Sequence, residues 1–300
     1  VGAAIVGGMV GALRSGEINN CHNINTTVTG ESRNIGGIAG QANGSIIDCS
    51  NSGNVNGTDN TSISIGGIIG AFQGQVKGCI NTGTVTAAEG GYVGGIVGAD
   101  ACDAVNEIES KTVLCINRGI VSGVAEVGGI IGNACGTVSR CYNEGTVLGS
   151  GENIGGICGL VRLLYRAKIQ NTFNTGKLVA TISFEENIGG IVGSESTSIY
   201  NGFESAIISN NYNVGKIEIQ GTAENVGGAI GYVDTEKTGI TASNNHYLEG
   251  VVTESDTTRT YETSETETYM KSSDFVTDLN TGLETAAWEK TSGYPKLIGM

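Results

Sequence analysis

Short apolar runs alternate with glycine and asparagine along most of the chain, and one pattern returns at regular intervals. In it a Val or Ile precedes two glycines, two mostly aliphatic residues and a further glycine, as in NIGGICG at 153–159. Its eight copies lie at 4–11, 34–40, 64–70, 92–98, 126–132, 153–159, 187–193 and 225–231. Successive glycine pairs are 27 to 38 residues apart. That is the length of a supersecondary unit that stacks on its neighbours but cannot fold alone.

A second pattern lies between the glycine pairs, as in CINTGTV at 79–85 and CYNEGTV at 141–147. Each unit therefore contains three short apolar runs separated by Gly or Asn, residues that accept the positive φ of tight corners. Helical periodicity is absent before the last 30 residues. The pattern predicts an all-β fold, a right-handed parallel β-helix of about eight coils. At a strand spacing of roughly 4.8 Å it would form a rod about 35–40 Å long.

The aliphatic residues that flank each glycine pair, such as Ile154 and Ile157, are three positions apart. On a regular strand they would face opposite sides, because side chains alternate with a period of two. We predict that the glycines form a corner that turns both side chains into one core.

Cysteine and asparagine also recur at fixed places in the unit. The cysteines are Cys21, Cys49, Cys79, Cys115 and Cys141. Because Thr172 and Asn211 replace cysteine in the next two units, this column predicts a structural ladder of free, buried thiols rather than a metal site. The asparagines, at 23, 51, 81, 117, 143, 174 and 213, predict a ladder of hydrogen-bonded side-chain amides, with carbohydrate recognition as the functional alternative.

Composition and charge narrow the choice of partners. The chain has 50 Gly, one Pro and a formal net charge of −14, so a nucleic-acid backbone would be repelled. It contains no apolar run of about 18 residues, which predicts no membrane-spanning helix. Its two histidines, His22 and His246, form no zinc motif, and we expect neither metal nor cofactor. The densest acidic group, between Asp100 and Glu109, predicts a solvated loop.

The alternating motifs resemble the GLUG-motif repeats of bacterial surface proteins, most closely in EVGGIIGNACGTVSRCYNEGTV at 126–147. The resemblance covers roughly residues 5–252 and implies a secreted protein of the bacterial cell surface. Such repeats also occur in immunoglobulin A-cleaving zinc peptidases. This chain lacks the HExxH motif of a zinc peptidase, so the resemblance does not imply that activity.

Three segments follow from these patterns. Residues 1–252 are predicted to form the β-helix, and the Thr-rich acidic stretch 253–268 an exposed loop or linker. Residues 269–300, which also resemble the piece that follows GLUG repeats, are predicted to form a helix and strand cap. Phe275 and Leu279 would lie on its helix, and Trp288, Tyr294 and Leu297 would cover the last open coil. Because residue 1 lies inside a repeat, we expect an excised segment, or end-to-end self-association through the open end.

Repeat length varies mostly between the glycine pair and the cysteine column, from 13 to 22 residues. Stacking would align the insertions, at 99–111, 160–168, 194–206 and 232–239, along one edge of the rod, where loops often bind ligands. They supply the candidate binding residues, which are Arg162, Tyr165, Arg166, Tyr200, Phe203 and Tyr232.

The sequence favours a non-catalytic module that acts as an adhesin-like stalk or as a platform for a host protein or glycan. Two alternatives stay open. Many parallel β-helices are polysaccharide lyases or hydrolases, although no catalytic triad or clustered acid and base set is evident here. The chain could also be a purely structural spacer.

Overall fold

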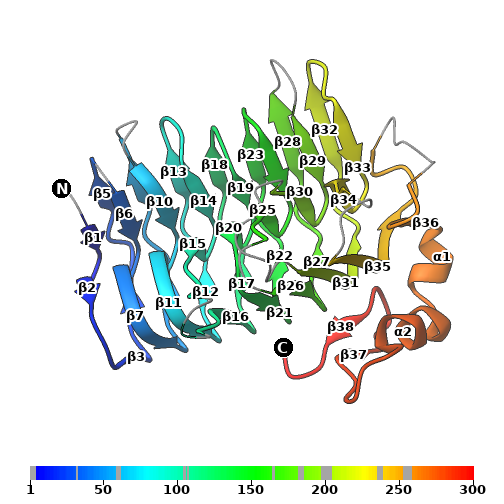
Figure 1. The fold of residues 1–300 in the computed structure, drawn as a ribbon, viewed down its shortest axis with the longest axis horizontal. Coiled ribbons are helices and arrows are strands. Elements are labelled where there is room, and N and C mark those ends of the chain that lie inside the picture. Colours follow the sequence, from blue (N-terminus) through cyan, green and yellow to red (C-terminus); the bar gives the residue numbers. More distant parts are fainter. Residues whose placement is uncertain are drawn as a thin grey trace.

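The computed structural model describes residues 5–31, 33–58, 62–103, 106, 108–163, 166–181, 186–196, 205–234, 239–252 and 259–300. These residues form a solenoid of stacked parallel strands, with the chain advancing steadily from the N-terminal to the C-terminal end (Figure 1). The predicted all-β parallel solenoid is confirmed. The first sheet has eight strands and the third has seven, so the chain makes about 7 turns rather than eight.

Each turn contributes to three sheets. Sheet 1 contains β1 (Ile5–Gly7), β6 (Arg33–Gly36), β10 (Ser62–Gly66), β14 (Tyr92–Gly94), β19 (Val127–Gly128), β24 (Asn153–Gly155), β29 (Asn187–Gly189) and β33 (Asn225–Gly227). Sheet 3 contains β5 (Val28–Gly30), β9 (Val55–Gly57), β13 (Val85–Ala87), β18 (Val121–Gly123), β23 (Val147–Gly149), β28 (Leu178–Thr181) and β32 (Ile217–Gln220).

Sheet 2 has 21 strands because most turns contribute two or three successive strands to it. The section after the glycine pair contains β2 (Val10–Leu13), β7 (Ala39–Ile47), β11 (Ile69–Lys77), β15 (Val97–Asp100), β20 (Ile131–Ala134), β25 (Cys158–Val161), β30 (Val192–Glu195) and β34 (Ile230–Tyr232). The remaining strands are β3 (Glu17–Asn19), β16 (Lys111–Val113), β21 (Thr137–Ser139), β26 (Ala167–Gln170), β31 (Ala206–Asn213), β35 (Ile240–Leu248), β4 (His22–Asn23), β8 (Ser50–Asn51), β12 (Ile80–Asn81), β17 (Ile116–Asn117), β22 (Tyr142–Asn143), β27 (Phe173–Asn174) and β36 (Thr263–Glu265).

The register places equivalent residues of successive turns above one another. Ile154 pairs with Val127 on one side and Ile188 on the other, and Asn143 pairs with Asn117 and Asn174. The columns read from the sequence are therefore ladders in the structure.

The glycine motif is required by close backbone approach. A Cβ added to Gly155 would lie 1.9 Å from the carbonyl oxygen of Cys158, and one added to Gly156 would lie 2.0 Å from that of Gly190. At Gly159 a Cβ would meet the backbone of the preceding turn at 2.7 Å. Contacts this short are sterically forbidden, so the chain can bend sharply here only because these positions lack a side chain.

Both aliphatic residues beside the glycine pair are buried, as predicted. The prediction that they share a single core is wrong. Ile154 and Ile157 are each 0% exposed. Ile154 belongs to a cluster of residues from sheets 1 and 3, whereas Ile157 belongs to a separate cluster within sheet 2. The bend at the glycines directs the two side chains into different compartments.

The asparagine column forms a continuous amide ladder inside the solenoid. Each Nδ2 donates to the Oδ1 of the next asparagine, at 2.7–2.9 Å from Asn23 through to Asn213. From Asn51 onward the same side chain also bonds the backbone N–H and carbonyl two residues later, as Asn143 does at Gly145. The ladder therefore satisfies polar groups that the fold buries at every turn.

The cysteines of the predicted column run beside this ladder. All eight cysteines of the chain are free thiols. In the column each Sγ donates to the carbonyl oxygen two residues earlier, at 3.2–3.4 Å. Burial is the main cause that raises the pKa of Cys115, so this thiol stays protonated and unreactive.

The residue before each position of the cysteine column has a positive φ all along the described solenoid. The residues are Asn20, Asp48, Gly78, Leu114, Arg140, Asn171, Asn210 and Asn244, with φ between 50° and 66°. Asn, Asp and Gly tolerate this left-handed conformation, whereas other L-residues pay about 1–2 kcal/mol. Leu114 and Arg140 are therefore strained.

We expect Leu114→Asn to raise the free energy of unfolding by about 0.5–1 kcal/mol, because asparagine relieves strain at φ 57°. Urea denaturation would measure the change. The reciprocal variant Asn171→Leu, at the equivalent position with φ 53°, should lose a similar amount. A stabilising effect of leucine at 171 would contradict the strain argument.

The C-terminal segment contains α1 (Glu267–Met270), α2 (Ser273–Asn280), β37 (Trp288–Glu289) and β38 (Lys296–Leu297). Ser272 accepts a hydrogen bond from the N–H of Phe275 at 3.1 Å and caps α2, which buries Phe275 and Leu279. Neither helix of the described chain has the length and apolar character needed to cross a membrane.

Two expectations for this end of the chain need correction. Trp288 does not cover the end of the solenoid, because it packs on its flank, with ring centroids 5.3 Å from Tyr212 and 5.9 Å from Phe173. The stretch 253–268 is also not simply an exposed linker. Glu262 is only 8% exposed, and β36 pairs with β35; both therefore belong to the end of the solenoid. Residues 253–258 lie outside the described chain.

Candidate functional site

Among the residues that the structure describes, two hollowed surfaces lie on different sides of the coil. One is the angle between sheet 1 and the first section of sheet 2, which we call the inner groove. The other is the flank covered by the C-terminal segment.

The inner groove forms where the glycine bend brings the outward faces of two sheets together. Its volume is about 450 Å³. It is lined by Glu126, Glu152, Asn153, Leu160, Asn187, Ser194, Glu195, Ser196, Glu224, Asn225 and Tyr232. The lining comes from four successive turns, so the groove runs along the solenoid axis.

One wall of the inner groove is a second amide ladder. Asn153, Asn187 and Asn225 each precede the aliphatic residue of the glycine motif, so alternation turns them outward. Asn187 Nδ2 donates to Asn153 Oδ1 at 3.0 Å, and Asn225 Nδ2 donates to Asn187 Oδ1 at 2.9 Å. These bonds hold the amides in fixed orientations, and each Asn keeps further hydrogen-bonding capacity for a ligand.

Carboxylates make the inner groove acidic. Burial, and then the neighbouring charge of Glu152, raises the pKa of Glu126, while Arg162 opposes the shift. Glu195, at the end of β30, is 2% exposed and accepts a hydrogen bond from the N–H of Asp234 at 3.2 Å. A ligand in this groove would be neutral or cationic, because an anion would be repelled.

Arg162 and Tyr92 contact each other beside Glu126. Arg162 follows β25, and its guanidinium donates a hydrogen bond to the hydroxyl of Tyr92. The guanidinium carbon lies 5.2 Å from the Tyr92 ring centroid, a cation–π contact. Because Tyr92 begins β14 and Glu126 immediately precedes the neighbouring strand β19 of sheet 1, this contact fixes Arg162 at one end of the inner groove.

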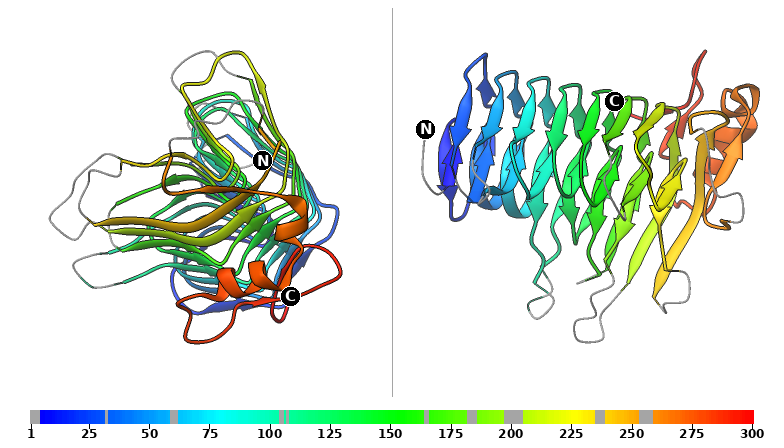
Figure 2. Two further views of the ribbon diagram at one scale, coloured as in Figure 1. Left: turned by 90° about the vertical axis from the view of Figure 1, so that its right-hand side faces the viewer. Right: turned by 90° about the horizontal axis from the view of Figure 1, so that it is seen from above.

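The structure brings only some of the predicted binding residues to this groove. Tyr232 lines it, and Arg162 lies at its end. Arg166 is exposed just before β26 and is not part of the lining. Tyr165, Tyr200 and Phe203 lie outside the described residues. The four insertions all begin where the first section of sheet 2 ends, after β15, β25, β30 and β34. The left view of Figure 2, along the solenoid axis, shows the strands of successive turns stacked over one another.

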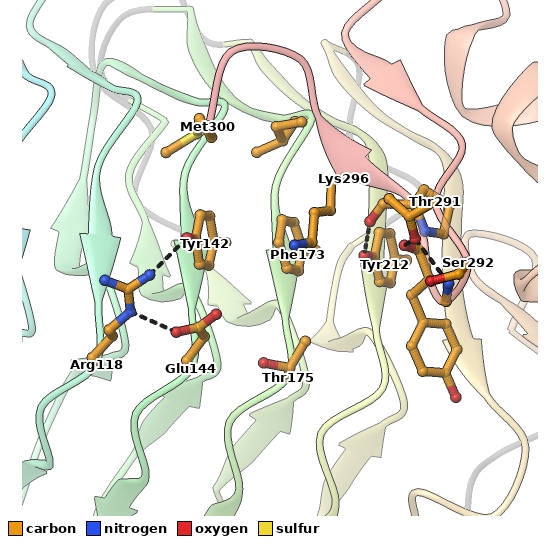
Figure 3. A pocket seen from close by; sticks show the side chains of 14 residues that line it. Arg118, Tyr142, Glu144, Phe173, Thr175, Tyr212, Thr291, Ser292, Lys296 and Met300 are labelled. Carbon is orange, nitrogen blue, oxygen red and sulfur yellow. Dashed lines mark hydrogen bonds and ion pairs between the residues drawn. The ribbon is translucent and has the colours of Figure 1, made fainter.

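The second surface carries a stack of aromatic rings (Figure 3). Tyr142 and Phe173 stack with centroids 4.7 Å apart, and Phe173 and Tyr212 with centroids 5.1 Å apart. They occupy the position after the cysteine column, facing away from the amide ladder. The C-terminal segment covers Tyr212, whose hydroxyl donates to the carbonyl of Pro295 at 2.6 Å.

A cleft of about 560 Å³ remains beside this stack, with Lys296 and Met300 on its rim. Three of its polar side chains pair with one another, since Arg118 Nε lies 2.7 Å from Glu144 Oε2 and a second guanidinium nitrogen bonds the Tyr142 hydroxyl at 3.3 Å. The stacked rings offer mainly their edges, because Tyr142 is 8% and Phe173 6% exposed. The flank is therefore better explained as the seat of the C-terminal segment than as a ligand site.

Comparison with known families identifies the repeat. Residues 31–56 match the GLUG motif. The matched GLUG residues run from just before β6, through the glycine bend and β7, to β9, so one GLUG motif corresponds to one turn of the solenoid.

The GLUG turns have a fold neighbour among solved structures. It is a protein from Bacteroides ovatus described as a "putative immunoglobulin A1 protease". The TM-score is 0.55 at 16% identity, over 90% of this chain and 75% of the other, a likeness that establishes the fold alone. No curated protein sequence matches the chain.

Sequence reasoning missed most of the inner groove. The first position of each glycine motif is Ile5, Asn34, Ser64 and Tyr92 in the early turns, and Glu126, Asn153, Asn187 and Asn225 in the last ones. This unbroken run of amide and carboxylate side chains in the last turns was a visible signal. Its meaning depends on the concave bend, which the sequence does not reveal.

Proposed function

We propose that this chain is a secreted bacterial surface module that binds a neutral or amine-bearing glycan in the inner groove and catalyses no reaction. The observation that carries the proposal is the outward amide ladder of Asn153, Asn187 and Asn225 with Tyr232 beside it. Strands are spaced by roughly 4.8 Å, which is about the length of a pyranose ring. Successive sugars could therefore meet successive amides. The GLUG match supports the proposed location of this chain outside the cell.

Binding by the intact chain tests this proposal. Neutral and amino-sugar oligosaccharides would be screened on an array, and the best ligand measured by isothermal titration calorimetry. We expect Asn187→Ala and Tyr232→Ala each to weaken binding at least tenfold, because they remove an amide and the one aromatic ring of the lining. Glu144→Ala, on the opposite flank, is the matched control and should bind as the unmodified chain does.

Two results would count against this function. Equal losses in the groove variants and in Glu144→Ala would show that the inner groove is not the site. If no glycan binds, the spacer interpretation replaces the binding module.

A carbohydrate-active enzyme is the second candidate, and one observation favours it. Glu126, whose pKa is raised, lies near Glu152 in the same groove. An acid whose pKa is raised, placed near a second carboxylate, is the arrangement that glycosidases use. Release of reducing or unsaturated sugars, with and without calcium and lost in Glu126→Gln, would establish it.

A further inference from the structure

Cys102 and Cys135 have no place in the cysteine column, yet the solenoid brings them together. Cys135 lies in the tight connection between β20 and β21, and Cys102 lies two residues past β15 in the insertion of the preceding turn. Because β15 pairs in register with β20, the start of that insertion passes over the connection that holds Cys135.

Asp100 completes this group and is held firmly in place. It ends β15 and is only 9% exposed, which corrects the expectation of a solvated acidic loop at this position. Its carboxylate accepts hydrogen bonds from the N–H groups of Cys135 at 2.6 Å and Gly136 at 3.1 Å. One oxygen of Asp100 and the two sulfur atoms all lie within 4.8 Å of one another.

The charge around Asp100 is unbalanced. Within the described chain no Lys, Arg or His forms an ion pair with it. A buried carboxylate without a counter-charge is costly, and a bound cation would offset that cost.

The donor set selects the kind of cation. Two thiols and one carboxylate are ligands that Zn²⁺ takes, with bonds of about 2.3 Å to sulfur and about 2.0–2.2 Å to oxygen. Tetrahedral geometry at those lengths needs the donors less than about 4 Å apart, so a small inward movement suffices. Cys135 is 1% exposed and Cys102 is half-buried. The ion would therefore enter past Cys102, where the fourth position can hold water.

We propose that Asp100, Cys102 and Cys135 form a zinc site that links the insertion at 99–111 to the next turn of the solenoid. The two thiols lose their protons as they bind the ion. The proposal is independent of the glycan function, since none of these residues lines the inner groove.

Zinc titration of the reduced, metal-free full chain tests the site. Calorimetry should show one Zn²⁺ per chain, and cobalt(II) in its place should give the intense thiolate-to-metal absorption of a two-sulfur site. Cys102→Ser should weaken zinc binding at least tenfold; it changes a half-buried loop residue and is expected to fold. Asp100→Asn should also weaken binding. Cys21→Ser, from the cysteine column, is the matched control and should bind zinc normally.

Three results would overturn the proposal. The reduced chain could fail to bind zinc, or Cys102→Ser could bind it as tightly as Cys21→Ser does. Mass spectrometry could instead find a Cys102–Cys135 disulfide in the isolated protein that, once reduced, takes up no zinc.

Discussion

Replacing Asn143 with alanine should lower the free energy of unfolding by about 3–5 kcal/mol, because the side chain serves four buried groups at once. Its Oδ1 accepts from Asn117 Nδ2 at 2.8 Å and from the N–H of Gly145 at 3.2 Å. Its Nδ2 donates to the carbonyl of Gly145 at 2.8 Å and to Asn174 Oδ1 at 2.9 Å. Each partner left unsatisfied in the interior costs about 1–3 kcal/mol, less where it keeps another bond.

Urea denaturation followed by circular dichroism would measure the loss. Asn43→Ala is the matched control, because Asn43 lies on the solenoid surface and is exposed, and it should change stability by less than about 0.5 kcal/mol. Asn143→Asp keeps the shape but loses both donated bonds, to Asn174 and to the carbonyl of Gly145, and adds a buried charge, so it should destabilise at least as much. A loss below about 1 kcal/mol in Asn143→Ala would mean that the ladder contributes little.

The repeated motifs made the fold predictable because stacking converts sequence periodicity directly into spatial columns. Once Asn117, Asn143 and Asn174 are aligned, a parallel strand spacing places their amides within bonding distance. The all-β solenoid, the amide ladder and burial on both sides of the glycine pair therefore follow from one observation, the fixed order of two motifs.

Other features were hidden because they depend on the path of the backbone. A residue with left-handed backbone conformation precedes the cysteine column along the described solenoid. Because Leu114 and Arg140 stand at two of these positions instead of Asn, Asp or Gly, the sequence does not show the pattern. The glycine pair separates two cores because the bend is sharp, which spacing alone cannot show. The inner groove and the buried Asp100 follow from the same bend and from the stacking of an insertion on the next turn.

The end of the solenoid shows a further case. In earlier turns the N–H groups at the glycine bend donate to the next turn, as Ile191 and Val192 donate to the carbonyl of Ala229 at 2.7 and 3.1 Å. In the last turn Glu262 Oε2 replaces that carbonyl and accepts from Ala229 and Ile230 at 2.8 and 2.7 Å. Arg259 donates to the carbonyls of Ile230 and Gly231 at 2.7 and 2.6 Å. The composition of this Thr-rich acidic stretch does not indicate that two of its charged side chains, Arg259 and Glu262, bond the backbone groups that a further turn would otherwise bond.

We therefore expect Glu262→Ala to lower the free energy of unfolding by about 3–4 kcal/mol, since it leaves two buried N–H groups without an acceptor and Arg259 without its nearby carboxylate. Glu262→Gln keeps one acceptor oxygen and should lose about half as much. Glu249→Ala, an exposed glutamate near the same end, is the matched control.

Burial raises the pKa of Glu262, so the folded state holds its proton more tightly than the unfolded state. The contribution of this titration to stability is then present at low pH and is lost as pH rises through the folded pKa. Thermal unfolding of Glu262→Gln should lack that pH-dependent component, and an unchanged pH profile would assign the titration to another carboxyl.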